Sequence, residues 1–207
     1  MATLPSPRHS SAPSWRIVGT VALLFAAACG PKAEAPKPAA TDSVAGVASD
    51  TSGMAKMPGM AMTGDPDHDF VRMMGDHHKG LIAMAHEAME ADRGTAESRS
   101  DGQKLDAKQD GELEQMVKML EASWKDPYNP KAMPADLATV DALKQESGQA
   151  FASQFYRNVV AHHRRAITMI DEYLPKAVRA DVKAMAEKMR RDQLAEIAAF
   201  GRKAGTP

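Results

Sequence analysis

The chain has 207 residues, of which 26% are charged, and its formal net charge is -1 at pH 7. This balance argues against nucleic acid as the main partner, because binding to a phosphate backbone requires an excess of Lys and Arg. Only one Cys is present, so the chain cannot form an internal disulfide.

The first 28 residues are typical of an export signal. Arg8 and Arg16 accompany an apolar run at 17–27, which is too short to span a membrane as a permanent helix. Small residues lead directly to Cys29, which resembles a lipoprotein signal in which the cysteine becomes a lipidated N-terminus. We therefore predict an exported protein with a lipid anchor at Cys29. Because Gly30 rather than Asp follows, the predicted location is the outer membrane, facing the periplasm. An ordinary signal peptide or a buried apolar segment is the alternative.

Residues 29–66 are predicted to form a flexible tether. Pro, Ala, Lys, Thr and Ser dominate its first part, without an apolar period that could support a core. Its last part carries four methionines, interrupted by Pro and Gly: Met54, Met57, Met60 and Met62. Flexible thioethers can surround Cu(I), which accepts soft ligands. The segment is therefore a possible Cu(I) site, and chance in a chain with 15 Met is the alternative.

The rest of the chain is predicted to be helical. Ala, Met, Lys, Glu and Arg, which favour helices, are frequent, and strand signals are few. The expected helices cover about 67–93, 104–124, 136–174 and 177–200, with Pro or Gly near most of their ends.

A duplicated motif contains four of the seven histidines. His77-His78 is followed 85 residues later by His162-His163, and the surrounding Phe, Arg, Ile and Met positions coincide in the same register. A Gln-x-x-Glu segment at 109–112 matches one at 193–196. Each repeat is thus a His-bearing helix followed by a Gln-x-x-Glu helix. Two such hairpins predict one all-α domain at 67–204, an antiparallel four-helix bundle.

These segments resemble the repeated signature of the DUF305 family, over essentially all of residues 67–200. The resemblance implies a ferritin-like fold and export. The family includes Met-rich proteins implicated in periplasmic copper binding. One departure is that Asn158 and Val159 stand where the first repeat has Met73 and Met74.

Helical spacing indicates which side chains could bind a metal. Residues three or four apart share a helix face, so Met73 or Met74 could chelate with His77 or His78. Seven residues rise about 10.5 Å, so His77 and Met84 cannot hold one ion from a single helix. A single metal site would need ligands from several helices, or each helix would carry a separate site. The predicted metal ligands are His77, His78, His162, His163, Met73, Met74, Met84 and Met169.

Copper is the predicted ion, because imidazole suits Cu(II) and thioether suits Cu(I). Adjacent histidines point about 100° apart, so one of each pair is expected to face the interior and the other the edge. Glu112 and Glu196 could orient the imidazoles. His68 and His86 lack counterparts in the second repeat and are predicted to lie on the surface.

Three classes of function remain open from the sequence. The first is a membrane-tethered protein that sequesters copper or hands it to a partner, without acting as an enzyme. The second is a structural or interaction module with incidental metal binding. The third is a ferritin-like metal oxidase, but its di-iron site needs Glu-x-x-His, and no Glu stands three residues before any His. A mononuclear copper redox enzyme would fit the ligands, yet no substrate-handling motif points to one.

Overall fold

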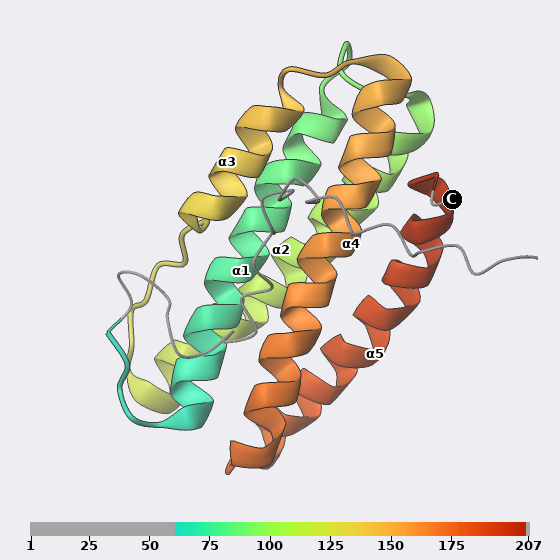
Figure 1. Cartoon of the computed structure of the whole chain (residues 1–207). Coiled ribbons are helices and arrows are strands. Elements are labelled where there is room, and N and C mark those ends of the chain that lie inside the picture. Colours follow the sequence, from blue (N-terminus) through green and yellow to red (C-terminus); the bar gives the residue numbers. More distant parts are fainter. Residues whose placement is uncertain (1–60, 206–207) are drawn as a thin grey trace, which may run out of the picture. The chain divides into compact units, whose positions relative to one another are not determined.

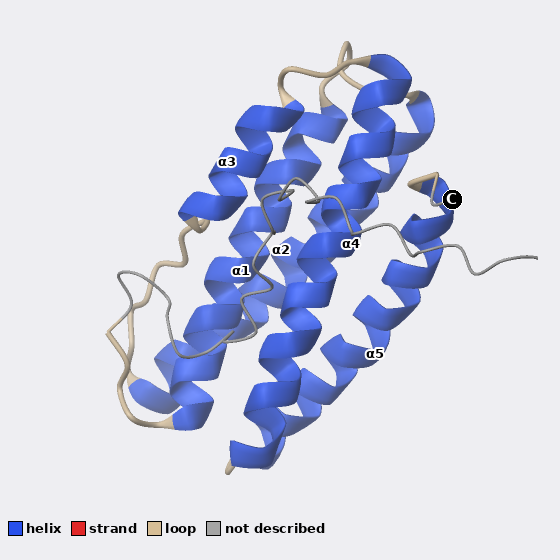
Figure 2. Cartoon of the chain, in the orientation of Figure 1, coloured by secondary structure: helices blue, strands red, loops and turns tan. Residues whose placement is uncertain are grey.

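The computed structural model describes residues 61–205, which form an all-α domain (Figure 2). The predicted signal peptide, Cys29, Met54, Met57 and Met60 lie outside these residues. The helices of the domain are α1 (Pro66–Met89), α2 (Ala96–Trp124), α3 (Pro134–Leu143), α4 (Gly148–Tyr173) and α5 (Ala180–Lys203). A 3₁₀ turn, η1 (Leu174–Lys176), follows α4. No helix in this part of the chain is long and apolar enough to cross a membrane.

Helix α1 lies at the centre of the domain and packs against α2, α3 and α4, while α5 packs against α4. Consecutive helices reverse direction along the chain (Figure 1). Helix α3 therefore carries the chain back alongside α1, and α2 and α4 run in the same direction. This return brings α4 against α1, so that the two His-His segments face each other.

The helix starts follow local capping chemistry. The Asp65 carboxylate accepts the free backbone N–H groups of residues 67 and 68, and Pro66 occupies the first turn. At α2, Thr95 and Ser98 cap each other's backbone N–H groups. This capping box starts α2 at Ala96, eight residues earlier than predicted from the apolar pattern.

The third predicted helix is wrong as a single element, because α3 and α4 are separate. Gly148 begins α4 with a φ of 55°, a conformation that side chains with a Cβ rarely adopt. Its N–H donates to the Arg93 carbonyl, and the Arg93 guanidinium donates to the Lys144 carbonyl. These bonds hold the α3–α4 turn against the loop between α1 and α2, a long-range contact that helical propensity does not register.

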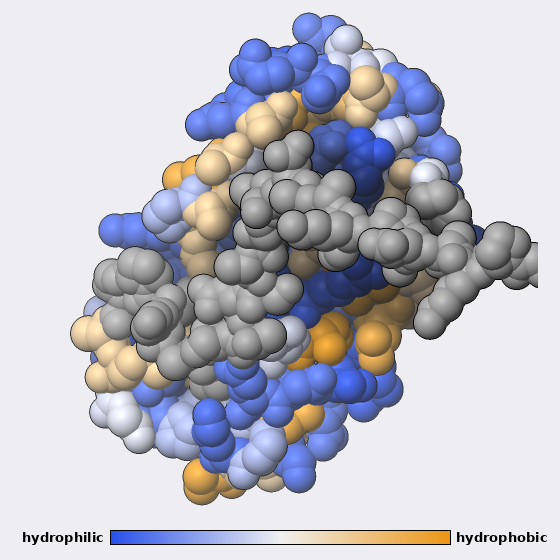
Figure 3. Space-filling model, in the orientation of Figure 1, coloured by the Kyte–Doolittle hydropathy of each residue, from blue (hydrophilic) through white to orange (hydrophobic). Residues whose placement is uncertain are grey.

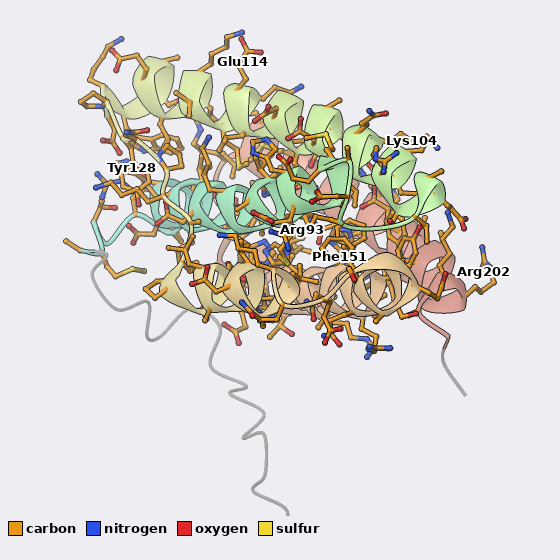
Figure 4. All side chains as sticks on the ribbon, turned by 90° about the horizontal axis from the view of Figure 1, so that it is seen from above. Arg93, Lys104, Glu114, Tyr128, Phe151 and Arg202 are labelled. Carbon is orange, nitrogen blue, oxygen red and sulfur yellow. The ribbon has the colours of Figure 1, made fainter. Side chains whose placement is uncertain are left out.

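The hydrophobic core consists of two clusters. One includes Leu105, Phe151 and Phe155, and the other includes Phe70, Leu120 and Tyr173, with the Phe70 and Tyr173 rings stacked at 3.9 Å. Figure 4 shows Phe151 between α4 and α1, whereas Glu114, Lys104 and Arg202 point outward. Between the two clusters, α1, α2, α4 and α5 present polar residues to the interior. The visible outer face is largely hydrophilic, with smaller apolar patches (Figure 3).

His68 is buried, so its predicted surface position is wrong. Its ring stacks on Trp124 with the centroids 4.7 Å apart, and its Nε2 lies 2.7 Å from an Asp126 carboxylate oxygen. Trp124 is the last residue of α2 and Asp126 follows the helix, so both partners lie beyond the reach of any local pattern. His86 is exposed as predicted, with 58% of its side chain accessible.

Candidate metal site

The four histidines of the two pairs meet in one layer between the hydrophobic clusters. His77 is 1% exposed, and His78, His162 and His163 are 0% exposed. His77 from α1 and His162 from α4 lie at the centre, with their ring centroids 3.6 Å apart and their planes tilted by 39°. The expectation that one histidine of each pair lies at the edge is wrong in terms of exposure, because α2 and α5 cover the outer rings.

The two outer histidines each face a glutamate of the neighbouring helix. His78 Nε2 lies 3.0 Å from Glu112 Oε2, and His163 Nε2 lies 2.8 Å from Glu196 Oε2, although the second contact lacks the alignment of a hydrogen bond. His78 Nδ1 also donates to the Met74 carbonyl. Both nitrogens of His78 are therefore engaged, and this residue would have to release a contact to bind a metal.

Glu196 is held as a carboxylate by its neighbours. Burial raises its pKa, but the His163 ring and the Lys108 ammonium, 2.8 Å from Oε1, outweigh this effect and bring the pKa below its ordinary value. A carboxylate next to an imidazole fixes the ring orientation, as in many metal sites. Glu112 and Glu196 are thus placed to orient His78 and His163.

The two central histidines have ring nitrogens that are buried without well-aligned hydrogen-bond partners. These are His77 Nε2 and both nitrogens of His162. Burial lowers the pKa of both histidines well below 6.5, with the neighbouring His162 adding to the effect at His77 and Arg165 at His162. The imidazoles are therefore neutral at pH 7, and the neutral ring is the form that binds metals.

Asp136 joins this centre, although sequence reasoning did not select it. Its side chain is 1% exposed, and Oδ2 lies 3.8 Å from His162 Nε2 without a hydrogen-bond partner. Oδ1 accepts a bond of 2.7 Å from Arg165. Burial raises the Asp136 pKa above its ordinary value. In the sequence, an Asp in the first turn after a Pro reads as a helix-start residue, and α3 has no counterpart in the first repeat that could have marked it.

Gly80 leaves the space that Asp136 occupies. A Cβ at Gly80 would lie 2.3 Å from Asp136 Oδ2 and 2.8 Å from its Cβ, so α3 would have to move. We expect Gly80→Ala to destabilise the protein by about 1–3 kcal/mol in urea unfolding. The control is Gly111→Ala in α2, where no atom lies within 4 Å and Ala should stabilise by about 0.5–1 kcal/mol. Equal stability of the two variants would contradict this packing.

Of the predicted methionine ligands within residues 61–205, Met62 is exposed and the others are buried. Met84 packs in the cluster on one side of the histidine layer, and Met74 and Met169 pack in the cluster on the other side. Met73 is fully buried on α1, one turn before His77. The thioethers therefore flank the imidazoles on both sides rather than forming one continuous stripe.

The arrangement fits a metal ion in its donor chemistry. Neutral, unpartnered imidazole nitrogens provide lone pairs, and thioethers and one carboxylate lie nearby. Within residues 61–205, no three His, Cys, Asp or Glu side chains already converge on a common point for an ion. Binding would thus require side-chain shifts.

The domain is similar to proteins of known structure and matches one family model. No curated protein sequence matches the chain. The structure is similar to CopM in its Cu(II)-bound form, with 23% identity, a TM-score of 0.57, and coverage of 67% of this chain and 95% of CopM. For the Cu(I)-bound form of CopM the identity is 26% and the TM-score 0.56, over 66% of this chain and 93% of CopM.

A DUF305 fragment from Deinococcus radiodurans is similar at 24% identity, with a TM-score of 0.59, over 68% of this chain and 95% of the fragment. The domain therefore shares the fold of these proteins. Residues 67–203 match the family described as "Domain of unknown function (DUF305)". This match covers more than half of the sequence, and the chain therefore belongs to the DUF305 family.

Proposed function

We propose that this protein is an exported, membrane-tethered protein that binds copper, for sequestration or for transfer to a partner. The observation that carries the proposal is the central pair of imidazoles, His77 and His162, which are buried and neutral and have three ring nitrogens without well-aligned hydrogen-bond partners. Buried polar groups in native proteins are nearly always paired, since an unpaired one costs about 1–3 kcal/mol. A bound metal ion would give these nitrogens the partner that the protein does not supply.

The similarity to CopM supports copper as the ion. The related structures are of CopM with Cu(II), with Cu(I) and with silver bound. Imidazole together with buried thioether accommodates both oxidation states of copper. The proposed role needs no reaction on a substrate. The proposed export and lipid anchor rest on residues 1–29, and retention in the membrane fraction that is lost in a Cys29→Ser variant would test the anchor.

We also propose that α1–α2 and α4–α5 are two copies of one hairpin, arranged as a ferritin-like four-helix bundle with α3 as an inserted crossover. Equivalent contacts support this origin. His78 faces Glu112 within the first hairpin, and His163 faces Glu196 within the second. Ferritin-like bundles contain one long crossover connection. Here α3 would lie in that connection, between α2 and α4.

Metal titration of the full chain tests the copper proposal. We expect binding of Cu(II), Cu(I) and Ag(I) in competition with a chelator of known affinity. Replacement of His77, His78, His162 and His163 by Leu, which has a similar volume, should weaken binding about 100-fold or more, with helical content by circular dichroism unchanged. The matched control is His86→Leu at the surface, which should bind as wild type.

Unchanged affinity in the four-Leu variant would contradict the site, and no binding by the wild type would contradict the function. A separate arm concerns the methionines of the tether. Deleting residues 54–62 should lower the Cu(I) stoichiometry without changing the melting temperature of the domain, and an unchanged stoichiometry would remove these methionines from the proposal.

A further inference from the structure

Asp136 distinguishes the central histidines from the outer ones. Glu112 and Glu196 each face a histidine on its outer side, whereas Asp136 approaches the central pair from α3. Only Oδ1 of Asp136 has a hydrogen bond, from Arg165, and Oδ2 is buried without one. A carboxylate with one unpartnered oxygen in the interior is costly. The nearby imidazole nitrogens His77 Nε2 and His162 Nε2 also lack well-aligned partners, so one ligand could serve all three side chains.

We propose that Asp136 completes a divalent-cation site with His77 and His162, with Cu(II) as the expected ion. This inference rests on the proposed metal-binding function and adds a carboxylate to its ligands. The three side chains come from α3, α1 and α4. Three helices can bring three ligands to one ion, whereas residues spaced along a single helix cannot.

The distances are close to those of a shared ion. Neighbouring ligand atoms on a tetragonal Cu(II) ion with bonds of about 2.0 Å lie about 2.8 Å apart. Asp136 Oδ2 and His162 Nε2 are 3.8 Å apart, and the His77 and His162 rings are already in contact. A shift of about 1 Å would bring Asp136 Oδ2 and His162 Nε2 to the ligand spacing. Gly80 leaves room for this oxygen, since a Cβ at that position would lie 2.3 Å from Asp136 Oδ2.

The carboxylate favours a divalent ion over a monovalent one. Coulomb attraction scales with the product of the charges, so Asp136 attracts a divalent ion twice as strongly as Cu(I) or Ag(I) at the same distance. Oxygen ligands also suit harder ions, whereas Cu(I) and Ag(I) prefer sulfur and nitrogen. The site is therefore expected to discriminate between oxidation states, while the flanking methionines serve the softer ions.

Arg165 provides the counter-charge in the metal-free protein. Its guanidinium is 2.7 Å from Asp136 Oδ1, and 51% of its side chain is exposed. The guanidinium can therefore move into water when a metal ion takes its place beside the carboxylate. Asp136 is the proposed ligand, and Arg165 only neutralises its charge while no metal ion is bound.

Three variants of the full chain test this assignment. Asp136→Asn keeps the side-chain volume and removes the charge. Asp141→Asn is the control on the same helix, at an exposed carboxylate. Arg165→Gln breaks the ion pair and leaves the carboxylate. We expect Asp136→Asn to weaken Cu(II) binding about 10- to 100-fold, to change Ag(I) binding less than about 3-fold, and to alter the electron paramagnetic resonance spectrum of bound Cu(II). The other two variants should retain Cu(II) binding and the wild-type spectrum.

The outcomes separate this inference from the function on which it rests. Unchanged Cu(II) binding and spectrum in Asp136→Asn would overturn the assignment while copper binding stands. Equal losses in Asp136→Asn and Arg165→Gln would also overturn it, because the effect would then come from the ion pair. Ag(I) binding without Cu(II) binding in the wild type would remove the divalent site alone, whereas binding of neither ion would remove both proposals.

Discussion

Replacing both His77 and His162 by Leu is expected to make the metal-free protein more stable. The substitution removes three ring nitrogens that are buried without well-aligned partners, and it joins the two hydrophobic clusters across the layer. Replacing unpaired buried polar groups by apolar groups of similar shape is neutral or stabilising. We expect a gain of about 2 kcal/mol, which corresponds to a melting temperature higher by about 4–8 °C. The same variant should lose the stabilisation that copper confers on the wild type.

Thermal unfolding with and without copper measures both effects. His86→Leu is the control, since its exposed ring should affect neither quantity. A double variant less stable than the wild type by 2 kcal/mol or more would show that the contact between the two imidazoles stabilises the domain. The layer would then be structural.

The pH dependence of unfolding gives an independent check on the same variant. Burial holds the pKa of His77 and of His162 well below 6.5 in the folded state, so below pH 6.5 the unfolded chain binds more protons than the native one. Stability is therefore complete above pH 6.5 and falls as the pH decreases, by up to about 1.4 kcal/mol per pH unit for each histidine. The double Leu variant should show a smaller loss between pH 6.5 and pH 5.

The second large effect is expected at Asp67, which ties the start of α1 to the junction between α4 and α5. Its buried carboxylate accepts hydrogen bonds from the Tyr173 hydroxyl and from the backbone N–H groups of Val178 and Arg179. Hydrogen bonds to charged groups contribute about 1.5–3 kcal/mol each. Asp67→Ala should therefore lower the free energy of unfolding by about 3–5 kcal/mol in urea titrations.

Two further variants define this effect. Asp141→Ala, at an exposed carboxylate of α3, should change stability by less than about 0.5 kcal/mol. Tyr173→Phe removes one of the three bonds and should cost a fraction of the Asp67→Ala effect. If Asp67→Ala proves no more harmful than Asp141→Ala, the carboxylate does not anchor α5.

The helical elements were largely predictable because their signals are local. The pattern from 67 to 93 corresponds to α1, which ends four residues earlier than predicted, at Met89. The pattern from 177 to 200 corresponds to α5, with each end shifted by three residues. Missed boundaries depended on finer chemistry. The Thr95–Ser98 capping box extends α2, and the positive φ of Gly148 separates α3 from α4.

The sequence by itself determined the all-α class and the repeated histidine motif, because helical periodicity and the motif are both expressed over a few neighbouring residues. Only the tertiary structure decided which groups have partners. Pairing of His77 with His162, of His162 with Asp136, and of His68 with Trp124 joins residues far apart in the chain. Hydrogen-bond satisfaction and burial are properties of such contacts. For this reason the imidazole nitrogens without well-aligned partners, and the Asp136 carboxylate beside them, are brought together only when α3 and α4 pack against α1.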